Sequence, residues 1–278
     1  MYQAVLFLYI GIPKMLHMKI FTFSLALLMA FSAFNNNTKQ NNTGTTDTLS
    51  SEKPAEAAFK KVEPVKLTPA DVPASINIKG KVQDVWKWED NNGENFLITS
   101  IVAPYKDKCD YAEMDEPCFT AELYAYQFKK SGDKYELVWK VEDAVKGCAF
   151  DNTCEFIKDA ATVTDLDTDY IAETKVQYKL ACRSDVSPAY MKLIMHEGDV
   201  KYSLRGSMWL KASDDDKFIV TEQDANLEKL PKKTDEFEQI MQTWGRYETE
   251  KDFANAPEEF LSFAKHEWMK FVIETIGQ

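Results

Sequence analysis

Between residues 76 and 209, apolar residues recur at every second position in several short segments, which is the pattern of β-strands. The predicted strands cover residues 76–88, 95–102, 119–128, 135–141, 175–181, 190–196 and 200–209. Polar turns that contain Gly, at 90–93, 130–133 and 197–199, join them in pairs, as in antiparallel hairpins. The strand over 119–128 is largely apolar on both faces, which favours a position in the middle of a sandwich or barrel.

The end of the chain changes to a helical period. Helices are predicted over 235–244 and 257–276, and the second begins with Pro257 followed by two glutamates. Its apolar stripe at helical spacing contains Phe260, Ala264, Trp268, Phe271 or Val272, and Ile276. The stripe favours packing on the sheet, with a partner-binding surface as the alternative. The expected fold is mainly β, an antiparallel sandwich, barrel or propeller-blade-like sheet, with two C-terminal α-helices, α+β overall.

The first 33 residues have the features of a secretory signal peptide. Lys19 follows Met18, the expected translation start, and precedes a short apolar run that ends in small residues. That run is shorter than the roughly 20 residues of a membrane-spanning helix, so we expect removal, with no transmembrane helix left. Residues 34–73 are mostly polar and are predicted to be a disordered tether. A β-rich domain at 74–230 and a helical appendage at 231–278 follow, in a protein that is exported to the periplasm or cell surface.

The charge of the chain argues against nucleic acid as a partner. The formal net charge is −12, with 45 acidic against 33 basic side chains. Phosphate binding needs a basic patch, and no Lys/Arg cluster in the sequence supplies one. An acidic exported protein is better suited to divalent cations, cationic proteins or neutral glycans.

An acidic loop carries the clearest candidate chemistry. Asp165, Asp167, Asp169 and Glu173 occupy positions 1, 3, 5 and 9 of the loop, and the carbonyl group of Ile171 lies between the last two. Ca²⁺ binds about 6–8 oxygens of this kind, so the five residues are predicted to hold it. A solvated acidic turn is the alternative.

The same loop is similar to the Asp-rich calcium loop of FG-GAP and integrin-type repeats, D-x-D-x-D-G-x-x-[DE]. Tyr170 stands where those repeats have Gly. A residue other than Gly at this position must avoid or tolerate a positive φ angle.

The five cysteines allow disulfides in an exported protein. We predict the local pairs Cys109–Cys118 and Cys148–Cys154, with Cys182 left as a buried thiol. The sequence leaves the connectivity open, and five reduced thiols are the alternative. A zinc site is not expected, because no pair has C-x-x-C spacing.

A second candidate site is a polar stretch between two predicted strands. Arg183, Ser184 and Asp185, with Arg205 and Lys192 further along the chain, are predicted to form a small binding pocket. In the alternative, Arg183 pairs with Asp185 and braces the turn. Ser184 lacks the sequence context of a nucleophile, and no catalytic residue is nominated.

The run from Val163 to Gly206 resembles an exported Bacteroidetes family described as surface polysaccharide biosynthesis proteins. The motifs that carry the resemblance are Thr164 to Asp167, Tyr178 to Pro188, Lys192 to Glu197 and Tyr202 to Gly206. The resemblance implies an envelope protein linked to surface glycan, with envelope glycan or envelope protein as partner, and it brings no catalytic residues.

Three functions therefore stay open. The first is a non-catalytic, calcium-stabilised accessory or binding module in polysaccharide biosynthesis or display. The second is a glycan-active enzyme that uses a carboxylate pair. The third is an inhibitor of a cationic protein such as lysozyme, because residues 176–182, with 192–193 and 202–204, are faintly similar to periplasmic C-type lysozyme inhibitors.

Overall fold

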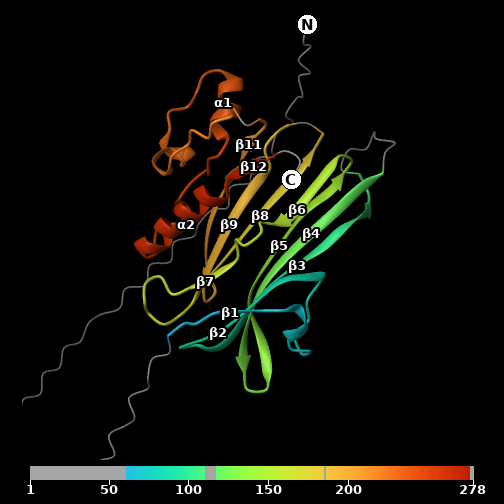
Figure 1. Ribbon diagram of the computed structural model, residues 1–278, viewed down its shortest axis with the longest axis vertical. Helices are drawn as coiled ribbons and strands as arrows, with labels where there is room; N and C mark the ends of the chain where they lie inside the picture. Colours follow the sequence, from blue (N-terminus) through green and yellow to red (C-terminus); the bar gives the residue numbers. More distant parts are fainter. Residues whose placement is uncertain (1–60, 110–116, 185, 214, 276–278) are drawn as a thin grey trace, which may run out of the picture. The chain divides into compact units, whose positions relative to one another are not determined.

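Two antiparallel β-sheets, packed face to face, form the centre of the computed structural model, which describes residues 61–109, 117–184, 186–213 and 215–275 (Figure 1). The first sheet has the order β1 (Val65–Leu67), β2 (Lys81–Asp90), β3 (Gly93–Asp107), β4 (Cys118–Ser131), β5 (Lys134–Cys148). The second has the order β10 (Val200–Ser207), β9 (Tyr190–Glu197), β8 (Glu173–Arg183), β6 (Asp151–Phe156), and β7 (Thr162–Thr164) also pairs with β8. The predicted β-rich α+β class is confirmed.

The α-helices follow the two sheets in the chain, and they are α1 (Glu236–Thr243) and α2 (Glu258–Phe271). A short 3-10 turn, η1 (Pro69–Asp71), lies between β1 and β2, and three more lie near the helices: η2 (Glu222–Asp224), η3 (Leu227–Lys229) and η4 (Lys251–Phe253). The α1 helix begins where the sequence predicts. Asp235 caps its start, because its side chain accepts a hydrogen bond from the Glu238 backbone N–H at 2.9 Å. Among the described residues, no helix has the length and apolar character needed to cross a membrane.

The predicted hairpin turns are confirmed. β2 ends at Asp90 and β3 begins at Gly93, β4 and β5 flank Gly132, and β9 and β10 flank Gly198. These three glycines have φ angles of 104°, 60° and 54°, in the region that side chains with a Cβ rarely adopt.

Three apolar clusters separate the molecule into layers. The cluster between the two sheets contains Trp88, Leu97, Leu123, Trp139, Val176, Tyr178 and Ile194. The opposite face of the second sheet packs on α2 through Met191, Leu193, Leu204, Phe260, Ala264 and Trp268. The outer face of the first sheet is covered by the segment around Ile76. The apolar stripe predicted on the last helix therefore packs on the sheet, as Figure 1 also shows for α2 and β9.

The folded domain begins earlier than the sequence predicts. Val62 is buried, and β1 pairs with β2 so that Leu67 lies opposite Val85, although residues 61–73 were expected in the tether. The short β1 strand pairs with the edge of the longer β2 strand, a contact that three residues are too few to reveal by their own pattern. The predicted signal peptide and the rest of the tether lie outside the described residues.

The last helix is shorter than the sequence predicts. α2 ends at Phe271, and β12 (Ile273–Thr275) then pairs in parallel with β11 (Trp209–Lys211). The backbone N–H of Trp209 donates to the backbone carbonyl of Val272 at 2.8 Å. Because Val272, Ile273 and Thr275 are β-branched, they favour an extended backbone once a partner strand is present. Ile276 lies outside the described residues.

One predicted disulfide is confirmed and the other is wrong. Cys109 is bonded to Cys118, but Cys148 is bonded to Cys182, and Cys154 is a free buried thiol. The reason is the register of β6 on β8, which places Cys182 beside Asn152 near the start of β6 and Cys154 beside Leu180. Cys182 therefore lies close to the end of β5, and the bond joins the two sheets. Two disulfides indicate an oxidising environment.

Peptide mapping without reduction should show the Cys148–Cys182 and Cys109–Cys118 links. Burial raises the pKa of Cys154 to about 12, so its thiol should react with iodoacetamide only after unfolding. A linked Cys148–Cys154 peptide from the folded protein would contradict the structure.

Candidate metal centre

The acidic loop connects β7 to β8 and is closed at its base by strand pairing. Thr164 lies opposite Glu173, so both ends of the loop are fixed in the second sheet. The tip is held by the first sheet, because the backbone N–H of Asn91 donates to the backbone carbonyl of Tyr170 at 2.9 Å. Buried Asp90 accepts hydrogen bonds from the Ala172 amide at 3.3 Å and from the Trp88 indole at 2.8 Å. The loop is therefore anchored on both sheets.

The loop contains two residues in a left-handed conformation. Thr168 has a φ angle of 63° and Tyr170 one of 67°. Tyr170 thus tolerates the positive φ that Gly supplies in the similar calcium loops, at a cost on the order of 1–2 kcal/mol. The hydrogen bond from Asn91 helps to hold this conformation.

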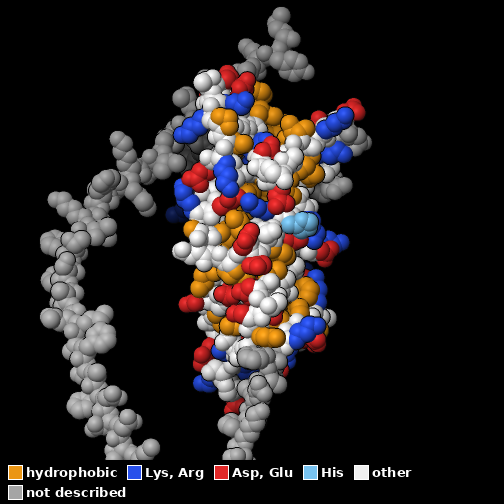
Figure 2. All heavy atoms as spheres, turned by 90° about the vertical axis from the view of Figure 1, so that its left-hand side faces the viewer, with side chains coloured by type: hydrophobic (Ala, Val, Ile, Leu, Met, Phe, Trp, Pro, Cys, Tyr) orange, Lys and Arg blue, Asp and Glu red, His pale blue; other side chains and the backbone are white. Residues whose placement is uncertain are grey.

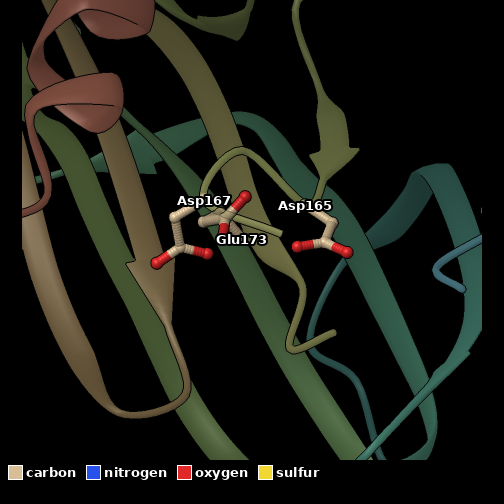
Figure 3. Close-up of side chains that lie close together, drawn as sticks. All are labelled: Asp165, Asp167 and Glu173. Carbon is tan, nitrogen blue, oxygen red and sulfur yellow. The ribbon is translucent and has the colours of Figure 1, made fainter. Parts of the chain in front are cut away.

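Three carboxylates of the loop converge. Asp165, Asp167 and Glu173 each place an oxygen within 4.8 Å of the others. Figure 3 shows Asp165 and Asp167 on either side of Glu173. All the donors are oxygens, which is the ligand type that Ca²⁺ and Mg²⁺ prefer.

Glu173 is the most deeply buried of the three, with 1% of its surface exposed. Its Oε2 accepts hydrogen bonds from the Leu166 amide at 2.9 Å and from the Thr164 hydroxyl at 3.1 Å. Its Oε1 and Asp165 Oδ1 are buried and accept no hydrogen bond from any described residue. Buried acceptors are almost always satisfied, so two orphaned oxygens in one cluster point to a missing positive partner.

The electrostatics of the cluster agree with that reading. Burial raises the pKa of Glu173 to about 8, although its hydrogen bonds with Leu166 and Thr164 act in the opposite direction. Burial and then the charge of Asp169 raise the pKa of Asp167. Both shifts favour the protonated carboxyl groups when no cation is bound, and a bound cation would keep them ionised.

The four carboxylates among the predicted metal ligands fall into two groups that share Asp167. Asp169 belongs to a second group with Asp167 and Glu197, and its Oδ1 accepts a hydrogen bond from the Ile171 amide at 2.7 Å. Glu197 was missed by sequence reasoning. It lies directly opposite Glu173 in the pairing of β8 with β9, and only that register reveals the two acids as neighbours.

The residues present fit a divalent cation at the first group. Asp165, Asp167 and Glu173 would hold it, and it would neutralise charge and satisfy the orphaned oxygens. Glu197 faces the same side of the sheet as Glu173, where its pKa is raised by burial and by Asp167 and Asp169.

The second predicted site is not assembled. Arg183 forms a two-pronged ion pair with Glu274 of β12, at 2.7 and 3.0 Å, and so braces the strand end. Arg205 lies on the face of the second sheet that Arg183 does not share, where it pairs across the strands with Lys192. Ser184 is exposed beyond the end of β8, and Asp185 lies outside the described residues, as does any pairing of it with Arg183.

No protein-family model, curated protein or solved structure matches the chain. The geometry of the loop and the chemistry of its donors therefore carry the functional argument.

Proposed function

We propose that the protein is an exported, non-catalytic binding module of the cell envelope, whose β-rich domain is stabilised by Ca²⁺ and which acts in surface polysaccharide biosynthesis or display. The observation that carries this proposal is the pair of buried, unpartnered oxygens, Asp165 Oδ1 and Glu173 Oε1, inside a cluster of three carboxylates.

The cation would have a structural role. The loop contacts the hairpin turn of β2 and β3 through Asn91, while its base belongs to the second sheet. Neutralising the carboxylates would let these contacts persist without charge repulsion. Ca²⁺ is favoured over Mg²⁺ because its coordination tolerates irregular geometry, whereas Mg²⁺ demands a near-octahedral arrangement.

The cluster is poorly placed for glycan hydrolysis. A glycosidase needs two carboxylates that reach the scissile bond from opposite sides. Glu173 is buried under the loop, where a sugar would not reach it. Binding therefore accounts for the site better than catalysis does.

Export and a link to glycan have separate support. The two disulfides fit an oxidising compartment. The resemblance of residues 163–206 to exported polysaccharide biosynthesis proteins favours the envelope and a glycan partner, and this stretch contains the metal loop together with β8, β9 and most of β10.

Isothermal titration tests the metal component. One Ca²⁺ should bind per chain, and Asp167→Asn should weaken that binding at least tenfold. Glu136→Gln removes an equal charge from an exposed position of β5 and should leave the affinity unchanged. Equal weakening by both variants, or no binding to the parent chain, would contradict the proposal.

A pull-down on isolated envelope polysaccharide tests the binding component. The Ca²⁺-loaded chain should be retained without release of new reducing ends. Release of reducing ends would favour the enzyme alternative, and retention on lysozyme without retention on polysaccharide would favour the inhibitor alternative.

A further inference from the structure

A polar pocket of about 400 Å³ lies at the open edge between the two sheets. Its walls come from β5, the last strand of the first sheet, and from β8, β9 and β10, the last of which ends the second sheet. The lining residues are Lys140 to Asp143, Tyr178, Lys192, Ile194, Lys201 and Arg205. The volume suits a small ligand of one or two rings.

Basic side chains are concentrated on one wall of this pocket. Arg205 lies directly opposite Lys192 in the pairing of β10 with β9, and Lys201 faces the same side because it is four residues from Arg205. Like charges placed opposite one another destabilise a sheet unless something compensates them. A negatively charged group beside these cations would therefore stabilise the arrangement.

Only part of that charge is compensated within the protein. Lys192 forms an ion pair with Asp143, which also accepts a hydrogen bond from the Tyr178 hydroxyl at 3.0 Å. Arg205 reaches Asp252 only at 3.4 Å. Lys201 is exposed and makes no ion pair with any described residue. Desolvation and the charges of Arg205 and Lys192 lower its pKa, while the charges of Asp252 and Asp143 act in the opposite direction.

Such an excess of basic groups is local. The chain has a net charge of −12, and Figure 2 shows acidic side chains gathered near the middle of the face that carries the C-terminal helices. A group of cations in a pocket of an acidic protein therefore marks a site for an anion.

The pocket also contains an acceptor, which narrows the kind of anion. Asp143 lies on the β5 side and meets the basic wall through Lys192, whereas its neighbour Glu142 lies opposite Tyr124 on the other face and pairs with Lys140 at 2.6 Å. A free phosphate ion has few donors and would be repelled by the Asp143 carboxylate. A sugar acid has one carboxylate for the cations and several hydroxyls that donate to carboxylates.

We infer that this pocket binds a carboxylate-bearing sugar unit of an acidic glycan, with Lys201 and Arg205 at the sugar carboxylate and Asp143 at its hydroxyls. This inference rests on the proposed glycan-binding function and names the class of glycan. Lys192 positions Asp143 and contributes to the positive potential.

Titration of the full chain with trigalacturonate, in the presence of Ca²⁺, tests the inference. Binding should weaken at least tenfold in Arg205→Gln and in Lys201→Gln, and it should fall as salt is raised. Lys232→Gln, which removes an exposed lysine of the segment before α1, should bind as the parent chain does. The melting temperatures of all three variants should match that of the parent.

Maltotriose and inorganic phosphate serve as comparison ligands. Selective binding of trigalacturonate supports the inference. Equal binding of maltotriose, unaffected by the two pocket variants, would overturn it and leave the proposed glycan binding intact. Binding of phosphate alone would reveal a simple anion site and also overturn it. If no saccharide binds in any arm, the inference and the glycan component of the proposed function both fail.

Discussion

Adding Ca²⁺ to the metal-free chain is expected to raise its melting temperature by about 5–10 °C at a free concentration of 100 times the dissociation constant. Such an excess adds about 2.7 kcal/mol to the free energy of unfolding, and 1 kcal/mol corresponds to roughly 2–4 °C in a domain of this size. The reason is that the cation binds the folded loop, where Asp165, Asp167 and Glu173 converge, and not the unfolded chain.

The variant Glu173→Gln should lose this response. Its carbonyl can still accept the hydrogen bonds from Leu166 and Thr164, while the charge that binds the cation is gone. In chelator, the variant should be at least as stable as the parent chain, because a buried carboxylate with a raised pKa has been replaced by a neutral group. Thermal denaturation with Ca²⁺ and with chelator measures both effects.

Glu136→Gln provides the matched control, since it removes one exposed carboxylate and should keep the full Ca²⁺ response. An equal destabilisation of Glu173→Gln in both buffers would mean that the side chain matters for packing alone.

The variant Glu267→Leu is expected to destabilise the domain by about 3–5 kcal/mol. Glu267 of α2 forms an ion pair with Lys175 of β8 at 2.5 Å, and the two side chains are 6% and 1% exposed. Loss of one partner leaves the other charge buried and unpaired. Burial already lowers the pKa of Lys175 to about 8, and Gln177 at 3.4 Å is its other hydrogen-bond partner among the described residues.

Replacing both partners should restore most of the stability. In Lys175→Met with Glu267→Leu, the side chains would pack among Phe263 and Phe271, whose rings already lie within 5.9 Å of the lysine nitrogen. Chemical denaturation at neutral pH gives the midpoints. If Glu267→Leu were no less stable than the double variant, Lys175 would not depend on its partner. Glu63→Gln, in an exposed ion pair with Lys61, should change the midpoint little.

The arrangement of strands is readable from the sequence because local chemistry determines it. Gly93, Gly132 and Gly198 each supply the left-handed conformation of a turn, and alternation in Val176 and Tyr178 identifies the face that meets the other sheet. The capped α1 helix is equally local, since Asp235 is followed by its own hydrogen-bond donor.

Features that depend on distant pairing are not readable in this way. The register of β6 on β8 decides that Cys148 meets Cys182, and no spacing of cysteines indicates that. β12 exists because β11 offers it a partner, although residues 272–275 continue a helical pattern in the sequence. Lys175 and Gln177 look like a solvent-facing pair, yet α2 buries them.

The candidate site shows the same division. The spacing of Asp165, Asp167 and Glu173 in one loop predicts their convergence, but Glu197 enters through strand pairing. The basic wall of the pocket combines Lys192 with Arg205 through another strand pair, on the face opposite to Arg183. The sequence motifs suggest that Arg183 and Arg205 belong to one site. They do not reveal that the two side chains lie on opposite faces of the second sheet.

The most direct measurement is long-wavelength anomalous diffraction from crystals of the full chain grown with Ca²⁺. A single calcium peak should lie between Asp165, Asp167 and Glu173, about 2.3–2.6 Å from their nearest oxygens. Anomalous density without a peak in the β7–β8 loop, with Asp165 Oδ1 and Glu173 Oε1 bonded instead to water or to protein donors, would contradict the account.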